Sequence, residues 1–150
     1  MMQAWKRVGL AVATVAFVGL GATGLSQAQN DPIKQRQALY KANGGAMKAI
    51  KAAIDSNGPA TAVVPEAGKL VNTFKTVPAH FPAGSEKGDT KASPDIWKNK
   101  ADFEKLNANA LAAATKLEAD AKGGDMKVVA ADFGALGGAC KACHDKYKMN

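Results

Sequence analysis

The chain has 150 residues, 47% of them hydrophobic, and a formal net charge of +7. This length suits one domain with its own core. The 20 basic residues are spread along the chain and are not interleaved with aromatic residues, so we expect no nucleic-acid partner.

The first 28 residues have the pattern of a secretory signal peptide. Two basic residues precede an apolar stretch from Val8 to Leu20, and small residues occupy the cleavage positions before Ala28. A retained membrane anchor is the alternative, but it needs about 20 apolar residues, and glycines interrupt the far end here. We therefore expect cleavage after Ala28, a periplasmic domain over residues 29–150, and no membrane association afterwards. Without the two basic residues of the leader, the net charge falls from +7 to +5.

The mature chain is predicted to be helical, since it is rich in alanine, lysine and leucine and lacks alternating β-branched runs. Asp31-Pro32 predicts the start of a first helix, and Asn57-Gly58-Pro59 its end. A second, shorter helix should run to about Val77, with Pro65 near its first turn. Residues at spacings of three and four predict the inner face of the first helix: Ile33, Gln37, Tyr40, Gly44, Met47, Ile50 or Lys51, and Ile54.

Two more helices follow a Gly/Pro-rich connection over residues 78–93. Ser93-Pro94-Asp95 predicts the start of the third helix and Gly123-Gly124 its end, and Asp125 can cap the fourth. Four helices with short connections predict an all-α antiparallel four-helix bundle. The alternative is a three-helix core with a loose second segment. The apolar stripe of the fourth helix has no gap: Met126, Val129, Phe133, Leu136, Cys140, Cys143 and Tyr147.

Residues 140–144 of the fourth helix form a complete C-x-x-C-H motif. Residues three and four apart share one face of a helix, so both thiols and the imidazole can point to the same side. This pattern predicts one covalent haem c, held by Cys140 and Cys143, with His144 as the axial iron ligand. Two alternatives are a haem-free dithiol redox pair, which needs a helix N-terminus beside a strand, and a zinc site completed by His80.

Spacing alone does not assign the other face of the iron. Met47 could reach the interior from the first helix, whereas Met149 is too close to His144 in sequence. We interpret Met47 and Met126 as core residues that fill gaps. His80 lies in a polar loop and is interpreted as a surface residue.

The motif region and the first-helix run from Arg36 to Lys41 resemble cytochrome c-prime, the class II c-type cytochromes, which are four-helix bundles. The segments 81–84 (FPAG) and 94–97 (PDIW) also look like this family. The resemblance implies a five-coordinate iron whose distal face is covered by Tyr40. It also implies that Arg36, and less strongly Gln37, lies near a haem propionate. On the proximal side, Lys148 stands where many members have an arginine. The lysine ammonium is a compact charge and cannot donate two parallel hydrogen bonds as the planar guanidinium of arginine can.

These features together predict a non-enzymatic periplasmic haem protein that binds diatomic gases, nitric oxide above carbon monoxide, with electron transfer to protein partners as a second role. Tyr40 should crowd the open position without weakening the bond to His144. The first alternative is a six-coordinate electron-transfer cytochrome that uses Met47 or Tyr40, although a free phenol ionises only near pH 10. The second is the haem-free dithiol protein. The family also implies a homodimer through the first two helices.

Overall fold

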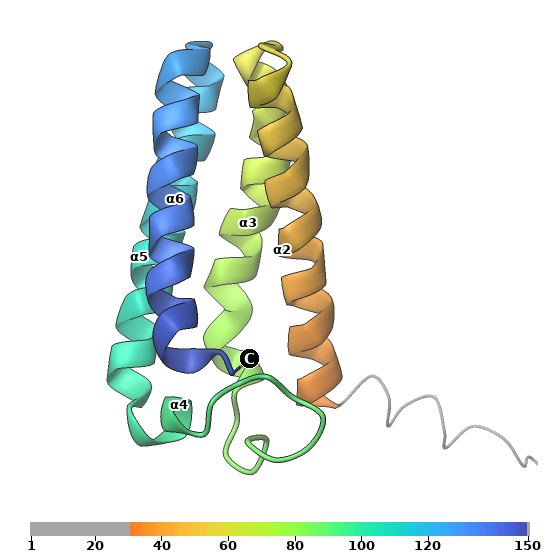
Figure 1. Ribbon diagram of the computed structural model, residues 1–150, viewed down its shortest axis with the longest axis vertical. Helices are drawn as coiled ribbons and strands as arrows, with labels where there is room; N and C mark the ends of the chain where they lie inside the picture. The colour runs from red at the N-terminus through yellow and green to blue at the C-terminus, as the bar shows by residue number, and fades with distance from the viewer. Residues whose placement is uncertain (1–30, 150) are drawn as a thin grey trace, which may run out of the picture.

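The computed structural model describes residues 31–149, so the predicted signal peptide and its cleavage site lie outside the described residues. Within this range, four long helices run up and down in turn (Figure 1): α2 (Pro32–Asp55), α3 (Val64–Thr76), α5 (Lys100–Gly123) and α6 (Met126–Tyr147). The predicted antiparallel four-helix bundle is confirmed. The alternative with a loose second segment is wrong, because α3 packs against both α2 and α5.

Two of the helices, α2 and α6, begin where the sequence predicted caps. The Asp31 carboxylate accepts a hydrogen bond from the N–H of Ile33 at 2.9 Å, and the Asp125 carboxylate accepts one from Lys127 at 2.8 Å. Each bond satisfies a backbone donor that has no partner inside its helix. At the end of α5, Gly124 takes a left-handed φ of 85°, which glycine adopts without steric cost.

The third predicted helix is not continuous. A short α4 (Asp95–Lys98) is separated from α5 at Asn99, whose φ of −125° and ψ of 45° are not helical. The Asn99 side-chain amide donates to the Asp95 carbonyl at 3.3 Å, a local bond that competes with helix formation. Short 3₁₀ helices also flank α3, η1 (Ala60–Val63) before it and η2 (Val77–His80) after it.

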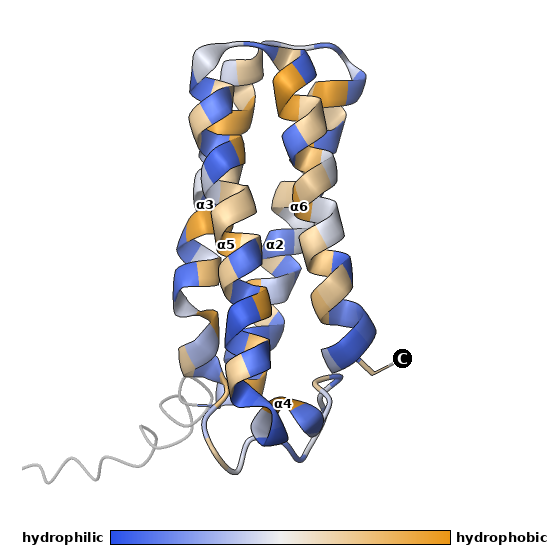
Figure 2. Ribbon diagram, turned by 90° about the vertical axis from the view of Figure 1, so that its left-hand side faces the viewer, coloured by the Kyte–Doolittle hydropathy of each residue, from blue (hydrophilic) through white to orange (hydrophobic). Residues whose placement is uncertain are grey.

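Each long helix carries both hydrophobic and hydrophilic residues (Figure 2). The hydrophobic core lies along the inner faces of these helices. Leu70 of α3, Leu117 of α5 and Leu136 of α6 are fully buried. Each such side chain contributes roughly 1.5–3 kcal/mol relative to an exposed one. The predicted stripe of α6 is confirmed, because all of its members are buried or half-buried. No helix in the described part of the chain is long and apolar enough to cross a bilayer.

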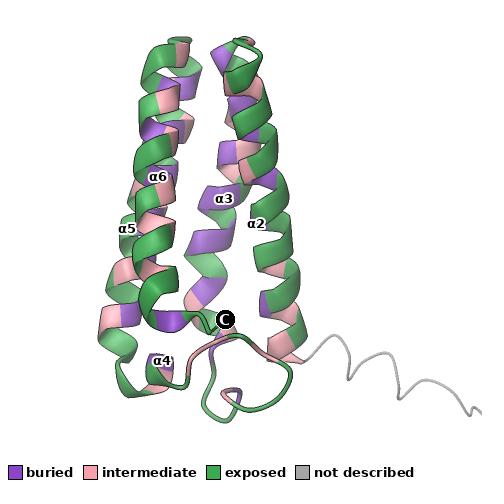
Figure 3. Ribbon diagram, viewed as in Figure 1, coloured by how far each residue is buried: buried purple, intermediate pink, exposed green. Residues whose placement is uncertain are grey.

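The predicted inner face of α2 points inward, but four of its members line a cavity and not the packed core. Its buried residues are Arg36, Asn43, Ala46 and Ile50, and much of the outer surface of α2 is exposed (Figure 3). Of the predicted stripe, only Ile50 is fully buried, and Tyr40 is 38% exposed. The physical reason is that this part of α2 borders a cavity rather than the packed core.

Candidate haem-binding site

A cavity of about 880 Å³ lies between α2 and α6 and reaches α3 and α5. This volume is within the range of roughly 300–1,000 Å³ typical of small-molecule and cofactor sites. The inner wall is mostly apolar, and polar side chains gather where the segment 89–92 and the end of α6 meet. The main apolar side chains of the wall are Leu70, Phe74, Phe81, Ile96, Phe103 and Leu106.

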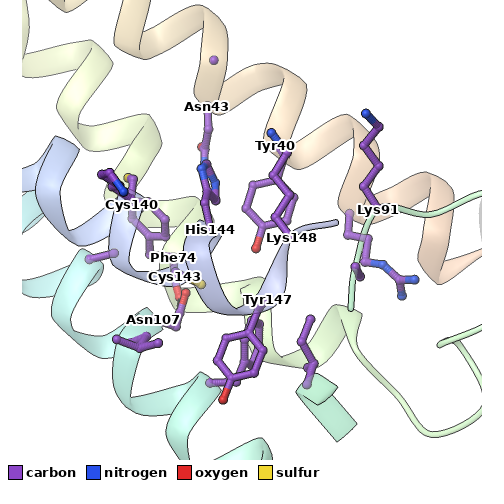
Figure 4. A pocket seen from close by; sticks show the side chains of 18 of the residues that line it. Tyr40, Asn43, Phe74, Lys91, Asn107, Cys140, Cys143, His144, Tyr147 and Lys148 are labelled. Atoms are coloured by element: carbon purple, nitrogen blue, oxygen red, sulfur yellow. Dashed lines mark hydrogen bonds between the residues drawn. The ribbon is translucent and has the colours of Figure 1, made fainter. Parts of the chain in front are cut away.

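The C-x-x-C-H residues of α6 all line this cavity. Cys140 and Cys143 are half-buried and form no disulfide, and His144 follows on the same face of the helix (Figure 4). The prediction that the three side chains share one face is therefore confirmed. Their arrangement follows from local spacing, because residues three and four apart on a helix are neighbours.

The protonation of these groups argues against a dithiol redox pair. Burial raises the pKa of the Cys140 thiol, and burial together with the neighbouring Cys140 raises the pKa of Cys143 to about 11. Both thiols are therefore neutral at pH 7, whereas redox-active cysteines need a lowered pKa. His144 is exposed, but partial loss of hydration and then Lys148 lower its pKa, which favours the neutral imidazole that ligates metals.

The zinc alternative has no ligand set in the described residues. Between residues 31 and 149, no group of three or more His, Cys, Asp or Glu side chains is placed to hold a metal ion. His80 is half-exposed and does not line the cavity, and its Nδ1 lies 3.1 Å from Oε1 of Gln35. His80, interpreted from the sequence as a surface residue, is therefore only half-exposed and lies outside the cavity lining.

Tyr40 faces the motif from the opposite wall, on α2 (Figure 4). Although 38% of its surface is exposed, the cavity walls remove enough hydration from the phenol to raise its pKa. The nearby Cys143 and Cys140 raise the pKa further, while Arg36 opposes the shift. Tyr40 is therefore a neutral phenol at pH 7. Three further α2 residues line the same wall: Asn43, Gly44 and Met47.

Arg36 borders the cavity but is only 3% exposed. Its Nη1 donates to the Ser85 hydroxyl at 2.9 Å and to the His80 carbonyl at 3.2 Å, and its Nη2 donates to the Ser85 carbonyl and the Thr90 hydroxyl. The guanidinium also lies 4.9 Å from the ring centre of Phe81. Arg36 thus fastens the segment 80–90, which forms one edge of the cavity, to α2. Within the described chain, its buried Nε has no hydrogen-bond partner.

The mouth of the cavity is polar, and both basic and acidic side chains are part of the cavity lining. Gln37 donates to the Asp89 carbonyl at 2.8 Å, and Lys91 and Lys148 both line the mouth. The end of α6 is tied to the neighbouring segment, because the Met149 N–H donates to the Lys91 carbonyl at 2.8 Å. Lys91 was not found from the sequence, since it lies in a loop without periodic spacing.

Comparison with known proteins identifies the family. A family model described as Cytochrome C' matches residues 31–148. The chain belongs to the cytochrome c′ family. It is 37% identical over 142 residues to cytochrome c′ of Rhodopseudomonas palustris, covering 93% of this chain and 96% of the relative. Cytochrome c-556 of Agrobacterium tumefaciens is 35% identical over 123 residues, covering 78% and 96%.

Solved cytochrome c′ structures share the fold. The protein from Thermochromatium tepidum matches with a TM-score of 0.75 and 31% identity, covering 79% of this chain and 95% of that one. A nitric oxide complex of a mutant cytochrome c prime from Alcaligenes xylosoxidans matches with a TM-score of 0.73 and 28% identity, covering 81% and 96%. A cytochrome c′ with ligand-controlled dimer dissociation matches with a TM-score of 0.75 and 31% identity, covering 79% and 95%.

Membership of the cytochrome c′ family confirms the predicted class of protein. Members are non-enzymatic haem proteins, and the resemblance drawn from the motif and the first-helix run was correct. The sequence analysis did not single out Asn43, although Asn43 lies three residues after Tyr40 and therefore on a neighbouring part of the same helix face.

Proposed function

We propose that this protein is a periplasmic haem c protein that binds nitric oxide and carbon monoxide at an open iron position. The observation that carries the proposal is that Cys140, Cys143 and His144 face Tyr40 across one apolar cavity. Nitric oxide complexes of cytochrome c prime among the similar structures support gas binding. The family and the predicted signal peptide support a periplasmic location.

The side chains around the cavity fit a haem. The two thiols would carry it covalently and the His144 imidazole would ligate its iron; when bound, haem supplies an iron atom that takes a diatomic gas as ligand. Tyr40 would limit access from the α2 side. The two propionates of a haem would lie at the mouth, where four cationic or hydrogen-bond-donating side chains line the cavity: Arg36, Gln37, Lys91 and Lys148.

The position of His144 is held by the packing behind it. Tyr147, three residues later, is buried, and its hydroxyl donates to Asp102 of α5 at 2.7 Å. The Tyr147 carbonyl accepts the Ser93 N–H at 2.9 Å. These contacts anchor the last turn of α6, so the imidazole of His144 is presented from a rigid element.

Absorption spectroscopy tests the proposal directly. We expect the purified protein to keep its haem after denaturation and to give a pyridine haemochrome spectrum of haem c. The resting protein should show high-spin bands that change when nitric oxide or carbon monoxide is added. As a control, the double variant Cys140→Ala/Cys143→Ala should lose the haem on denaturation. A wild-type protein without covalent haem, or with a low-spin spectrum that ignores both gases, would contradict the proposal.

A six-coordinate electron-transfer cytochrome is a second candidate, because Met47 lines the same cavity. Our proposal expects Met47→Leu to leave the high-spin spectrum unchanged, since the thioether is not a ligand. Tyr40→Met should instead shift the iron toward low spin, because residue 40 faces the motif and low-spin members of the family have methionine there. If Met47→Leu changes a low-spin spectrum into a high-spin one, the second candidate is correct.

We also propose a homodimer through α2 and α3, as the family resemblance implies. One similar structure is a cytochrome c′ whose dimer dissociates under ligand control, which supports this assembly. The net charge of +5 expected after removal of the leader favours acidic redox partners. Sedimentation of the haem-loaded protein, with and without carbon monoxide, measures the oligomeric state.

A further inference from the structure

Asn43 is a buried polar side chain in the wall of the candidate haem cavity. It is 8% exposed and lies one turn beyond Tyr40 on α2. In the described chain its amide makes no hydrogen bond to protein. The amide is not fully enclosed by protein, so it opens onto the cavity. A buried amide without a partner costs stability, and such groups in native proteins normally have one.

Asn107 provides an internal comparison. It lines the same cavity from α5 and is also 8% exposed, but its Nδ2 donates to the Phe74 carbonyl at 2.8 Å. That bond gives Asn107 a structural role, since it links α5 to α3. Asn43 has no equivalent bond, so the packing of the bundle does not explain its amide.

The surroundings of Asn43 leave room for a small molecule. The next residue, Gly44, also lines the cavity, and a Cβ atom built there would meet nothing within 4 Å. Tyr40 and Met47 border this space on either side along α2. Figure 4 shows the side chains of Tyr40 and Asn43 extending from α2 toward the motif residues of α6.

Asn43 does not belong to the polar mouth of the cavity. It lies seven residues after Arg36, or about 10 Å further along α2. The mouth residues gather near Arg36 instead: Gln37 follows it directly, Lys91 follows Thr90, to which Arg36 donates, and Lys148 pairs with Ala92. The amide therefore faces the interior of the cavity, where the gas ligand would lie, and not the edge where propionates would lie.

We propose that Nδ2 of Asn43 donates a hydrogen bond to the diatomic ligand on the α2 side of the cavity. This inference rests on the proposed function and adds a second distal determinant to it. Tyr40 disfavours every distal ligand through its bulk, whereas Asn43 favours ligands whose outer atom accepts a hydrogen bond. The two side chains, one helical turn apart, thus act in opposite directions.

Carbon monoxide is a suitable probe, because it does not weaken the bond opposite to it as nitric oxide does and so keeps to the face away from His144. We compare the ferrous haem-loaded wild type with Asn43→Leu, which keeps the approximate size, and Asn43→Val, which is smaller; neither side chain has a hydrogen-bond donor. Both variants should bind carbon monoxide about three- to tenfold more weakly, the effect of one neutral hydrogen bond. In the wild type, a donor near the oxygen draws electron density into the C–O antibonding orbital and lowers the stretching frequency. Loss of this donor should therefore move the C–O band of both variants to higher wavenumber.

The urea midpoint of the haem-loaded protein separates a ligand-binding role from a structural one. Asn43→Leu should leave this midpoint unchanged or raise it, whereas Asn107→Leu should lower it through loss of the bond to Phe74. If Asn43→Leu lowers the urea midpoint as much as Asn107→Leu does, Asn43 has a structural role and the inference is overturned. Failure of both Asn43 variants to fold would lead to the same conclusion.

The carbon monoxide data also separate this inference from the proposed function. If the wild type binds the gas and both Asn43 variants match its affinity and its C–O band, the inference is wrong and the proposed function stands. If the haem-loaded wild type does not bind carbon monoxide, the proposed function and the inference both fail.

Discussion

Replacing Tyr40 by alanine should raise the affinity of the ferrous haem-loaded protein for carbon monoxide about ten- to a hundredfold. The phenol ring lies on the α2 wall opposite His144, where it would compete with a distal ligand for space. Forcing extra atoms into a filled site costs roughly 1–3 kcal/mol, and removing the ring would relieve that cost. Since Tyr40 is 38% exposed, its truncation should leave the packed core intact.

Equilibrium titration with carbon monoxide measures this effect, and Tyr40→Phe is the matched control. Phenylalanine keeps the ring but not the hydroxyl, so its affinity should stay near that of the wild type if bulk is the cause. An alanine variant with wild-type affinity would show that Tyr40 does not crowd the ligand. A gain in the phenylalanine variant as large as in the alanine variant would attribute the effect to the hydroxyl instead.

Replacing Arg36 by leucine should lower the free energy of unfolding by about 3 kcal/mol. The guanidinium is 3% exposed and donates to His80, Ser85 and Thr90. Leucine would leave the buried Ser85 carbonyl and the part-buried His80 carbonyl without this donor. It would also remove the cation from above the Phe81 ring.

Urea denaturation of the haem-loaded protein measures the loss, and Gln37→Ala is the comparison. Gln37 is exposed and makes a single bond to the Asp89 carbonyl, so its removal should have little effect on stability. The stability of Arg36→Lys should fall between those of Arg36→Leu and Gln37→Ala, because an ammonium cannot make all the hydrogen bonds of the planar guanidinium. Faster amide exchange over residues 80–90 in Arg36→Leu would place the loss in the loop. A leucine variant as stable as Gln37→Ala would refute this role of Arg36.

The role of Arg36 connects the fold to the site. The family resemblance predicts an arginine near a haem propionate, and Arg36 does border the cavity. Its terminal nitrogens, however, are engaged by the segment that closes one edge of that cavity. Arg36 therefore shapes the mouth through the loop in addition to any direct contact with a propionate.

Several elements followed directly from local sequence. Helix starts are set by the caps at Asp31 and Asp125, whose carboxylates accept hydrogen bonds from backbone N–H groups two or three residues later. The end of α5 is set by Gly124, whose left-handed backbone cannot continue the helix. The break at Asn99 was not predicted, since the start signal Ser93-Pro94-Asp95 was assigned to one continuous third helix. The predicted inner face of α2 does point inward, but the sequence did not show that Gln37, Tyr40 and Met47 border a cavity instead of the packed core.

The sequence by itself determined that Cys140, Cys143 and His144 lie on one face of the last helix, because their mutual positions depend only on helical spacing. Only the tertiary structure decided what faces them. Tyr40 and Asn43 come from the other end of the chain, and the rotation that points them into the cavity is set by the packing of α2 on α3 and by the bonds from Arg36 to the loop. A local motif therefore identified the side of the site that would hold a haem, and long-range packing determined the side that would meet its ligand.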